Sequence, residues 1–328
     1  MEIPIVYKNE DLNEMVGEAE DAFFKFDLLN KNQVYKKAYR FPTTREVVIG
    51  EDIGNRPKTE DEIRLLWIDF AFANTVNEEN DQSVIGCMSL IKKDGKYRKI
   101  VDYITTFPSG DSDGIDLKIR EMFWDYKADY IVYDNRNGGE TIFNDLTKPR
   151  ENYERGSAWN KHGFTVINEM EYHVVAPQKI EDLKNRTIDG QAIPCLIPII
   201  GTSELNSTMW LDLQKTLRDG NIDLLIEDID FENEFSEQKE YYELSTEERY
   251  KIKLPYVMTM ALINEAINLS QEWKEGKVKL SEPRSGTKDI IVALSYGNYI
   301  ASLIINKLEQ DNNDNNEFNI NDWSFLSY

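Results

Sequence analysis

Two short apolar runs that each contain a late acidic residue define the middle of the chain. Residues 65–71 read Leu-Leu-Trp-Ile-Asp-Phe-Ala, and residues 128–134 read Ala-Asp-Tyr-Ile-Val-Tyr-Asp. Runs of this length and hydrophobicity are typical of buried strands. Residues 82–92 and 97–107 lie between them as two further strands, and the Asp-Gly pair that separates these two favours a hairpin. The pattern therefore predicts an antiparallel meander of three strands, followed by a fourth strand.

The remaining periodic segments predict helices around one more strand. Ile115, Ile119 and Met122 share one face of an amphipathic helix over 115–126. Residues 194–200 form a predicted fifth strand, and the other predicted helices cover 141–146, 205–218, 255–273 and 288–308. Three strands in a meander, then helix, strand, helix, strand and helices, is the element order of the ribonuclease H-like α/β fold. We therefore predict a mixed five-stranded sheet flanked by helices.

Composition separates one main domain from flanking and inserted segments. We expect the ribonuclease H-like domain to cover 61–310, and 1–60 to be a helical lead-in or linker with a helix over 12–29. Residues 221–250 are markedly acidic and are predicted to be an insertion. Residues 311–328 are rich in Asp and Asn at first, too polar to bury a core, and are predicted to be a disordered tail.

The overall composition indicates a well-buried core in a reducing compartment. The chain has 328 residues, of which 41% are hydrophobic, enough for one large domain. No apolar stretch approaches the roughly 18 residues of a membrane span, and the N-terminus lacks the basic and apolar regions of a signal peptide. The two cysteines, Cys87 and Cys195, are too few for a disulfide framework or a zinc cluster. We therefore expect a cytoplasmic setting and no membrane association.

The net charge argues against a simple nucleic-acid-binding surface. Sixty acidic residues against 38 basic ones leave a formal charge of −22. Lys and Arg contacts to phosphate supply most of the nonspecific affinity of proteins for DNA. Composition alone thus favours a solvated acidic surface that binds no polyanion, over one in which some acids bind cations and DNA is presented by something else.

Three aspartates occupy the positions at which the ribonuclease H-like fold carries acidic ligands. Asp69 lies in the first predicted strand, Asp134 ends the fourth, and Asp289 lies near the start of a predicted helix, where the helix dipole favours an ionised carboxylate. An aspartate at the end of a strand is also a common cap of a turn or helix. Asp81, at the start of the second strand, is a further candidate acid with the same structural alternative.

Such a trio suits the hydrolysis of a phosphodiester. The reaction needs an activated water and a stabilised leaving alkoxide, and two divalent ions about 4 Å apart provide both. Mg²⁺ and Mn²⁺ are hard cations that prefer carboxylate oxygens. The chain has only two histidines, His162 and His173, which argues against a histidine-built site.

The residues around the three acids resemble the nuclease motifs of phage large terminase subunits. The first motif resembles residues 68–71 with 80–85, and the second resembles Val132-Tyr133-Asp134 with Gly138 and Gly139. The third is similar to 287–290 followed by 293–299. Flanking segments fit the same family, at 23–26, 198–202 with Asn206 and Trp210, 265–269 and 277–280. The resemblance spans roughly residues 20 to 308.

This resemblance implies a metal-dependent endonuclease that cuts concatemeric phage DNA during genome packaging. Asp69, Asp134 and Asp289 would be catalytic ligands of a two-metal Mg²⁺ or Mn²⁺ site, with Asp81 as an additional acid. Double-stranded DNA, an ATPase motor domain, the small terminase subunit and the portal protein would be partners. The protein would act in the cytoplasm of the infected bacterial host.

Two features depart from the family pattern. No Gly-x-x-x-x-Gly-Lys-Ser/Thr phosphate loop occurs, so the ATPase motor is not in this sequence, and we expect either the C-terminal part of a larger subunit or a separately encoded nuclease. Ile290 stands where the family commonly has an arginine after the third acid. Lys288 is a candidate phosphate contact, although a lysine beside a helix start is usually solvated.

Two alternatives stay open. Another ribonuclease H-like nuclease, such as a resolvase or a transposase, would share the fold, although transposases of this class usually end the trio with Glu rather than Asp. A packaging scaffold or docking protein with a vestigial nuclease would keep the fold without the activity. Binding of Mn²⁺, which would raise the melting temperature of an intact site, separates this second alternative from an enzyme.

Overall fold

The computed structural model describes residues 19–70, 82–108, 112–136, 139–236, 243–283 and 287–321. The strands are β1 (Gln33–Tyr35), β2 (Ile63–Asp69), β3 (Gln82–Lys93), β4 (Lys96–Pro108), β5 (Tyr130–Asp134), β6 (Phe164–Val166), β7 (Ile193–Ile199), β8 (Ile222–Leu225), β9 (Ser270–Lys274) and β10 (Lys277–Ser281). The helices are α1 (Phe26–Asn30), α2 (Thr44–Ile49), α3 (Ser112–Tyr126), α4 (Gly139–Leu146), α5 (Pro177–Asn185), α6 (Ser203–Arg218), α7 (Asp228–Ser236), α9 (Thr246–Ile267) and α10 (Asp289–Asn321). Two short 3₁₀ turns are η2 (Gly156–Ala158) and η3 (Met170–Tyr172).

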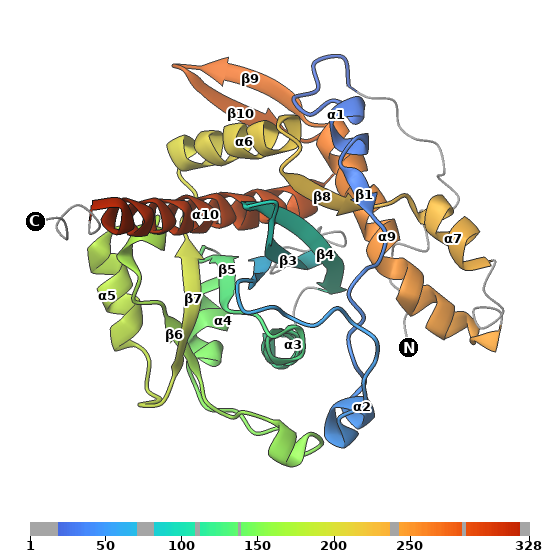
Figure 1. Ribbon diagram of the computed structural model, residues 1–328, viewed down its shortest axis with the longest axis vertical. Helices are drawn as coiled ribbons and strands as arrows, with labels where there is room; N and C mark the ends of the chain where they lie inside the picture. The colour runs from blue at the N-terminus through green and yellow to red at the C-terminus, as the bar shows by residue number, and fades with distance from the viewer. Residues whose placement is uncertain are drawn as a thin grey trace, which may run out of the picture.

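Eight strands form one mixed sheet in the order β1-β8-β4-β3-β2-β5-β7-β6 (Figure 1). Strand β3 is antiparallel to both of its neighbours, β2 and β4, and a tight turn with positive φ at Asp94 and Gly95 joins β3 to β4 as predicted. Strand β5 runs parallel beside β2, and β7 runs parallel beside β5. These five central strands are the predicted ones, so the ribonuclease H-like fold class is confirmed.

Three short strands extend the sheet beyond the five that we predicted. Strands β1, β6 and β8 have only three or four residues, too few to show a two-residue period in the sequence. Strand β8 lies in the predicted insertion 221–250 and β1 in the predicted lead-in 1–60, yet β8 pairs with β4 and β1 pairs with β8. Strands β1 and β8 therefore continue the central sheet from these two segments.

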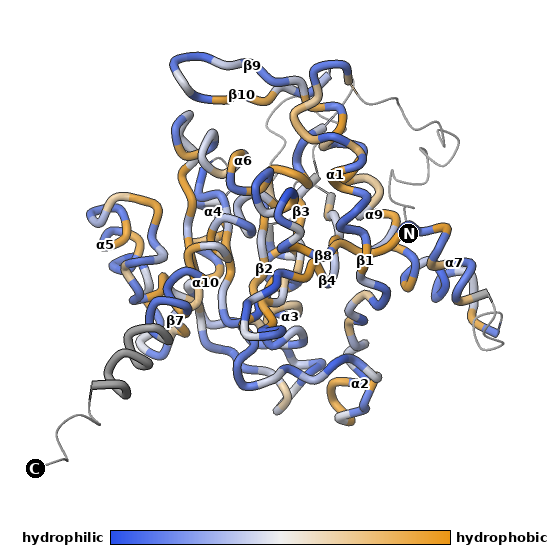
Figure 2. The backbone as a smooth tube through the Cα atoms, turned by 45° about the horizontal axis from the view of Figure 1, so that its top comes forward, coloured by the Kyte–Doolittle hydropathy of each residue, from blue (hydrophilic) through white to orange (hydrophobic). Residues whose placement is uncertain are grey.

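Helices cover both faces of the sheet, and each face has its own hydrophobic core. Along β2, Leu66 and Ile68 point to the core under α3 and α4, whereas Leu65 and Trp67 point to the core under α6, α9 and α10. This alternation follows from the two-residue period of a strand. Helix α10 crosses the middle of the molecule between α6 and the sheet (Figure 1). Hydrophobic segments gather in the interior, where the central strands lie (Figure 2).

Two glycines let α10 approach the sheet closely. The Trp67 side chain is fully buried between Gly86 of β3 and Gly297 of α10. A Cβ added at Gly86 would lie 1.9 Å from Trp67 Cζ2, and one at Gly297 would lie 2.7 Å from Trp67 Cβ. Neither position can hold a larger residue without displacement of Trp67 or α10. The distance between α10 and β2 is therefore set by these contacts.

Three other predictions differ from the structure. Residues 19–25 of the predicted helix 12–29 are not helical, and Ala22 instead forms a bridge to Ser270. The predicted helix 255–273 ends at Ile267, and the next residues form the hairpin β9–β10. The predicted disordered tail 311–328 is helical as far as Asn321, where the described residues end.

The length and apolar composition of helix α10 test the expectation that the protein does not associate with a membrane. Over Asp289–Asp311 it is long and apolar enough to cross a membrane by length and composition alone. However, 61% of its most apolar window is buried inside the protein, which is the position of a core helix. Its hydrophobicity is explained by contacts with the sheet and with α6.

Candidate metal centre

Two of the predicted acids lie side by side at the carboxyl ends of parallel strands. The register of β2 and β5 pairs Ile68 with Tyr133, so Asp69 and Asp134 are the next residues along each strand. Asp69 lies two residues after Trp67, and Asp134 lies two residues after Val132. Side chains two residues apart on a strand point to the same face, so both aspartates point toward the core beneath α10. The sheet therefore directs both carboxylates to the face that α10 covers.

Helix α10 brings the third acid to the same place. Asp289 is its first residue, and Tyr296 lies seven residues later, two turns along and on the same face. The Tyr296 hydroxyl donates a hydrogen bond to Oδ2 of Asp134 over 3.2 Å. Burial, followed by the charges of Asp134 and Asp69, raises the pKa of Tyr296. The first two turns of α10 thus lie over the ends of β2 and β5.

The electrostatics of Asp69 show that the three carboxylates interact. Burial raises the pKa of Asp69 well above its usual range, and the nearby charges of Asp289 and Asp134 raise it further. Arg136 acts in the opposite direction. Like charges held together in a partly desolvated site favour the binding of a cation or a proton. The predicted trio Asp69, Asp134 and Asp289 is therefore one electrostatic unit.

Asp134 has a cationic partner that the sequence analysis missed. The Arg136 backbone N–H donates to Asp134 Oδ1 over 2.9 Å, and Nη2 donates to Oδ2 over 2.8 Å. Arg136 Nη1 also donates to the carbonyl of Gly201 over 2.7 Å. The only feature of the sequence that could have indicated this ion pair is that Arg136 lies two residues after Asp134, directly after β5.

The three carboxylates are ligands that a hard divalent cation prefers, but they do not surround a single point. In the part of the chain that the structure describes, no three Asp, Glu, His or Cys side chains are grouped closely enough to hold an ion. The Asp134 carboxylate is instead bonded to Arg136. Binding of an ion by all three aspartates thus requires a local rearrangement. Asp81, the additional candidate, lies outside the described residues.

Glu265 holds the start of α10 rather than joining the trio. From α9, its Oε2 accepts hydrogen bonds from the backbone N–H groups of Ile290 and Ile291, at 2.9 and 3.1 Å, and Oε1 accepts one from Thr287. Free N–H groups at a helix start need such acceptors. Burial raises the pKa of Glu265 to about 7. Lys288, the candidate phosphate contact, forms an ion pair with Glu282.

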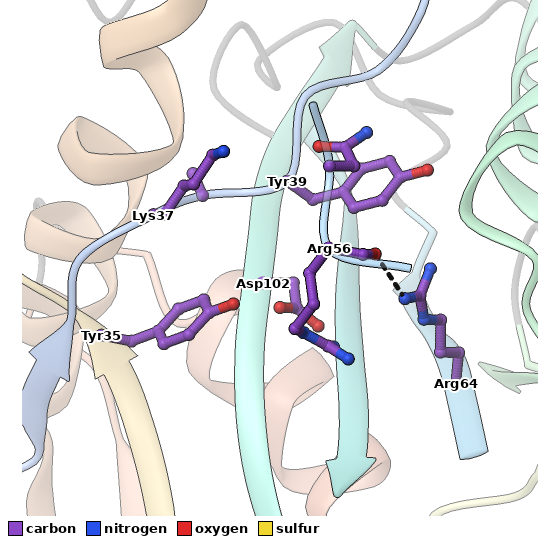
Figure 3. Close-up of a pocket in the computed structure, with 8 residues that line it drawn as sticks. Tyr35, Lys37, Tyr39, Arg56, Arg64 and Asp102 are labelled. Carbon is purple, nitrogen blue, oxygen red and sulfur yellow. Dashed lines mark hydrogen bonds between the residues drawn. The ribbon is translucent and has the colours of Figure 1, made fainter. Parts of the chain in front are cut away.

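A separate polar cavity lies beside β4 and the segment after β1 (Figure 3). Two arginines that line it, Arg56 and Arg64, both donate to Glu62, and Arg64 also donates to the Arg56 carbonyl. Asp102 accepts a hydrogen bond from the Tyr126 hydroxyl. The cavity volume is about 20 Å³, room for a single water molecule. Both of its arginines are paired with Glu62, so we assign it a structural role.

No family model matches the chain, and no curated protein matches it in sequence. Solved structures do match. The chain resembles the nuclease domains of phage large terminases. The magnesium-bound large terminase nuclease from thermophilic phage G20c is 12% identical, with a TM-score of 0.41 over 85% of this chain and 98% of that one.

A second phage protein gives a similar comparison. The nuclease domain of the large terminase subunit of bacterial virus Sf6 is 10% identical, with a TM-score of 0.40 over 86% of this chain and 98% of that one. The G20c nuclease has also been solved with cobalt, and a mutant of the Sf6 nuclease domain with manganese.

Proposed function

We propose that this protein is a divalent-metal-dependent endonuclease that cuts concatemeric phage DNA during genome packaging. The observation that supports this proposal is that Asp69 and Asp134 lie at neighbouring strand ends and that the charges of Asp289 and Asp134 both raise the pKa of Asp69. These residues come from two parallel strand ends and one helix start, and they are separated by 65 or more positions in the sequence. Three like charges held together lower the stability of the folded chain. Such clusters are common at functional sites.

Each part of the site has a distinct task in the proposed reaction. Asp69, Asp134 and Asp289 would hold Mg²⁺ or Mn²⁺. When bound, two such ions supply an activated water and stabilise the leaving alkoxide. Tyr296 orients the Asp134 carboxylate through its hydroxyl. Glu265 fixes the first turn of α10 and so the position of Asp289.

The other reactive side chains of the described residues have different roles. Both cysteines are fully buried, and burial raises their pKa values well above the usual range, so neither is a ready nucleophile. His162 lies against Asp189, and His173 donates to the carbonyl of Ile167. Neither partner, Asp189 or Ile167, is a member of the aspartate trio. Carboxylate chemistry therefore remains the best-supported mechanism.

The charge of −22 is compatible with a nuclease to which DNA is delivered. A motor domain, a small terminase subunit and a portal would hold double-stranded DNA at a high effective concentration near the site. The nuclease itself then needs little affinity for DNA, and weak binding limits indiscriminate cutting. We propose this setting in the cytoplasm of an infected bacterium. Tight, salt-sensitive binding of DNA by the chain alone would contradict it.

One observation favours a second candidate, a packaging scaffold with a vestigial nuclease. Arg136 is bonded to Asp134 and supplies a positive charge at the site without any ion. If this ion pair is permanent, the protein keeps the fold but cannot bind metal through Asp134. The two candidates differ in whether divalent cations bind at all.

Cleavage of supercoiled plasmid in Mn²⁺ or Mg²⁺ tests the proposal. We expect nicked and linear products from the unmodified chain and none from Asp134→Asn. Asp223→Asn is the matched control, because Asp223 also pairs with an arginine, Arg98, on a sheet strand. It should cut like the unmodified chain. If the unmodified chain and both variants fail to cut, and Mn²⁺ leaves the melting temperature unchanged, the scaffold function is the better supported of the two.

A further inference from the structure

Arg136 occupies an unusual position for an arginine at a proposed metal centre. Its guanidinium donates to both oxygens of Asp134, with Nε at 3.2 Å from each and Nη2 at 2.8 Å from Oδ2. The same carboxylate is a proposed ligand of a divalent cation. A guanidinium and a divalent cation cannot both contact the same carboxylate oxygens without strong repulsion, because each carries positive charge. Binding of the ion therefore weakens the contacts of Arg136 with these oxygens.

The surroundings show that the guanidinium can leave. The Arg136 side chain is 42% exposed, so one side of it faces solvent. The guanidinium also packs against Gly201. A Cβ added at Gly201 would lie 2.7 Å from Arg136 Nη2, so only a glycine leaves room for the guanidinium here. Asp134 itself is buried, so its carboxylate needs another cation when the guanidinium turns toward solvent, and an incoming divalent ion supplies that charge.

A second acceptor lies next to the guanidinium. Asn206 Oδ1 and the Arg136 guanidinium both border the space beside Gly201. A Cβ added at Gly201 would lie 2.6 Å from this oxygen, close to the guanidinium as well. This oxygen is buried and has no hydrogen-bond partner. A buried acceptor without a partner is uncommon and needs an explanation. It offers an acceptor to one donor of the guanidinium once Asp134 is no longer available, which leaves the other donors for a partner outside.

We propose that Arg136 is an exchangeable internal cation of the carboxylate site. It neutralises Asp134 until a divalent cation displaces it, and it then turns outward to contact a phosphate of the DNA substrate. The proposal rests on the metal-dependent nuclease function and describes how that site is regulated. Arg136 would therefore weaken metal binding before DNA arrives and strengthen DNA binding afterwards. A planar guanidinium with several donors suits both partners, carboxylate and phosphate.

Titration calorimetry with Mn²⁺, in the absence of DNA, tests the first half. Arg136→Gln should bind Mn²⁺ about tenfold more tightly than the unmodified chain, since one charge-assisted interaction no longer competes. Arg98→Gln is the matched control for net charge, because Arg98 is 34% exposed and pairs with Asp223. Its affinity should match that of the unmodified chain. Equal or weaker Mn²⁺ binding by Arg136→Gln would overturn the exchange.

Chemical rescue separates competition from a general charge effect. In Arg136→Ala, millimolar guanidinium ion should lower the Mn²⁺ affinity again, whereas it should leave the unmodified chain unchanged. No response of Arg136→Ala to guanidinium would argue against a binding site for that cation. This variant also replaces Arg136→Gln if the latter does not fold.

DNA binding in Ca²⁺ tests the second half. We expect Arg136→Gln to bind duplex DNA several-fold more weakly, with a dependence on salt concentration that is lower by about one phosphate contact. Unchanged DNA affinity and salt dependence would overturn the outward phosphate contact. Failure of the proposed function is distinguishable, since in that case neither the unmodified chain nor Arg136→Gln would bind Mn²⁺.

Discussion

The Tyr296 hydroxyl reaches from α10 to the end of β5 and donates to Asp134 Oδ2 over 3.2 Å. This hydrogen bond joins the helix that begins with Asp289 to the strand that ends with Asp134. It also lies where the charges of Asp134 and Asp69 both act on the tyrosine. The geometry of the trio therefore depends on a residue outside it.

Replacement of Tyr296 by Phe tests this dependence. The ring stays in the core while the donor to Asp134 is lost, so the carboxylate is less well oriented. A hydrogen bond to a charged group contributes about 1.5–3 kcal/mol, so we expect Mn²⁺ affinity and nicking rate to fall about tenfold or more. Calorimetry and plasmid nicking measure the two effects. Tyr299→Phe, on the same helix, is the control and should retain both.

The contact between Gly297 and Trp67 predicts sensitivity to a single methyl group. Gly297→Ala places a Cβ 2.7 Å from Trp67 Cβ and Cγ, which lie near the backbone and cannot rotate away. Helix α10 must then shift from the sheet, and overpacking of this kind costs about 1–3 kcal/mol. Urea unfolding measures the loss. Gly190→Ala adds a methyl group to open space and should leave the free energy of unfolding unchanged.

The pKa of Glu265 predicts how stability changes with pH. Burial raises this pKa from 4.5 to about 7, so the folded protein binds more protons than the unfolded chain between these values. The stabilisation by protonated Glu265 is present in full below pH 4.5 and is lost as the pH rises toward 7.

Glu265→Gln isolates this contribution in metal-free buffer. The amide retains an oxygen that accepts from the N–H groups of Ile290 and Ile291 but does not titrate. Between pH 5 and 8 the unmodified chain should lose stability relative to the variant, by up to about 2 kcal/mol after allowance for solvent screening. Urea unfolding at both pH values gives this difference. A constant difference would contradict the assignment.

Asp69 predicts opposite effects with and without metal. Because burial and two neighbouring carboxylates raise its pKa, Asp69→Asn should increase the melting temperature of the metal-free protein at pH 8. The unmodified chain should gain about 2.7 kcal/mol from Mn²⁺ at a hundred times its dissociation constant, and the variant should gain much less. Thermal unfolding with EDTA and with Mn²⁺ measures both. A variant that is stabilised by Mn²⁺ as much as the unmodified chain would exclude Asp69 as a ligand.

Local patterns in the sequence determined the central fold and the positions of the three acids. The apolar runs at β2 and β5, the Asp-Gly turn between β3 and β4, and the amphipathic face of α3 all depend on neighbouring residues, which a sequence displays directly. The alternation along β2 and β5 also directs Asp69 and Asp134 to one face. These features follow from the period of a strand or helix.

Only the tertiary structure decided which residues support the trio. Strand β8 forms by pairing with β4, and β1 by pairing with β8, whereas no local period marks segments of three or four residues. Glu265 reaches the start of α10 from another helix, and Arg136 bonds to Asp134 while it rests on Gly201, 65 residues later. Hydrogen bonds and packing across such separations depend on how the chain folds back on itself. The sequence alone predicted which strands and helix carry the three carboxylates, and the fold decided how these elements meet and what holds, orients and neutralises the carboxylates.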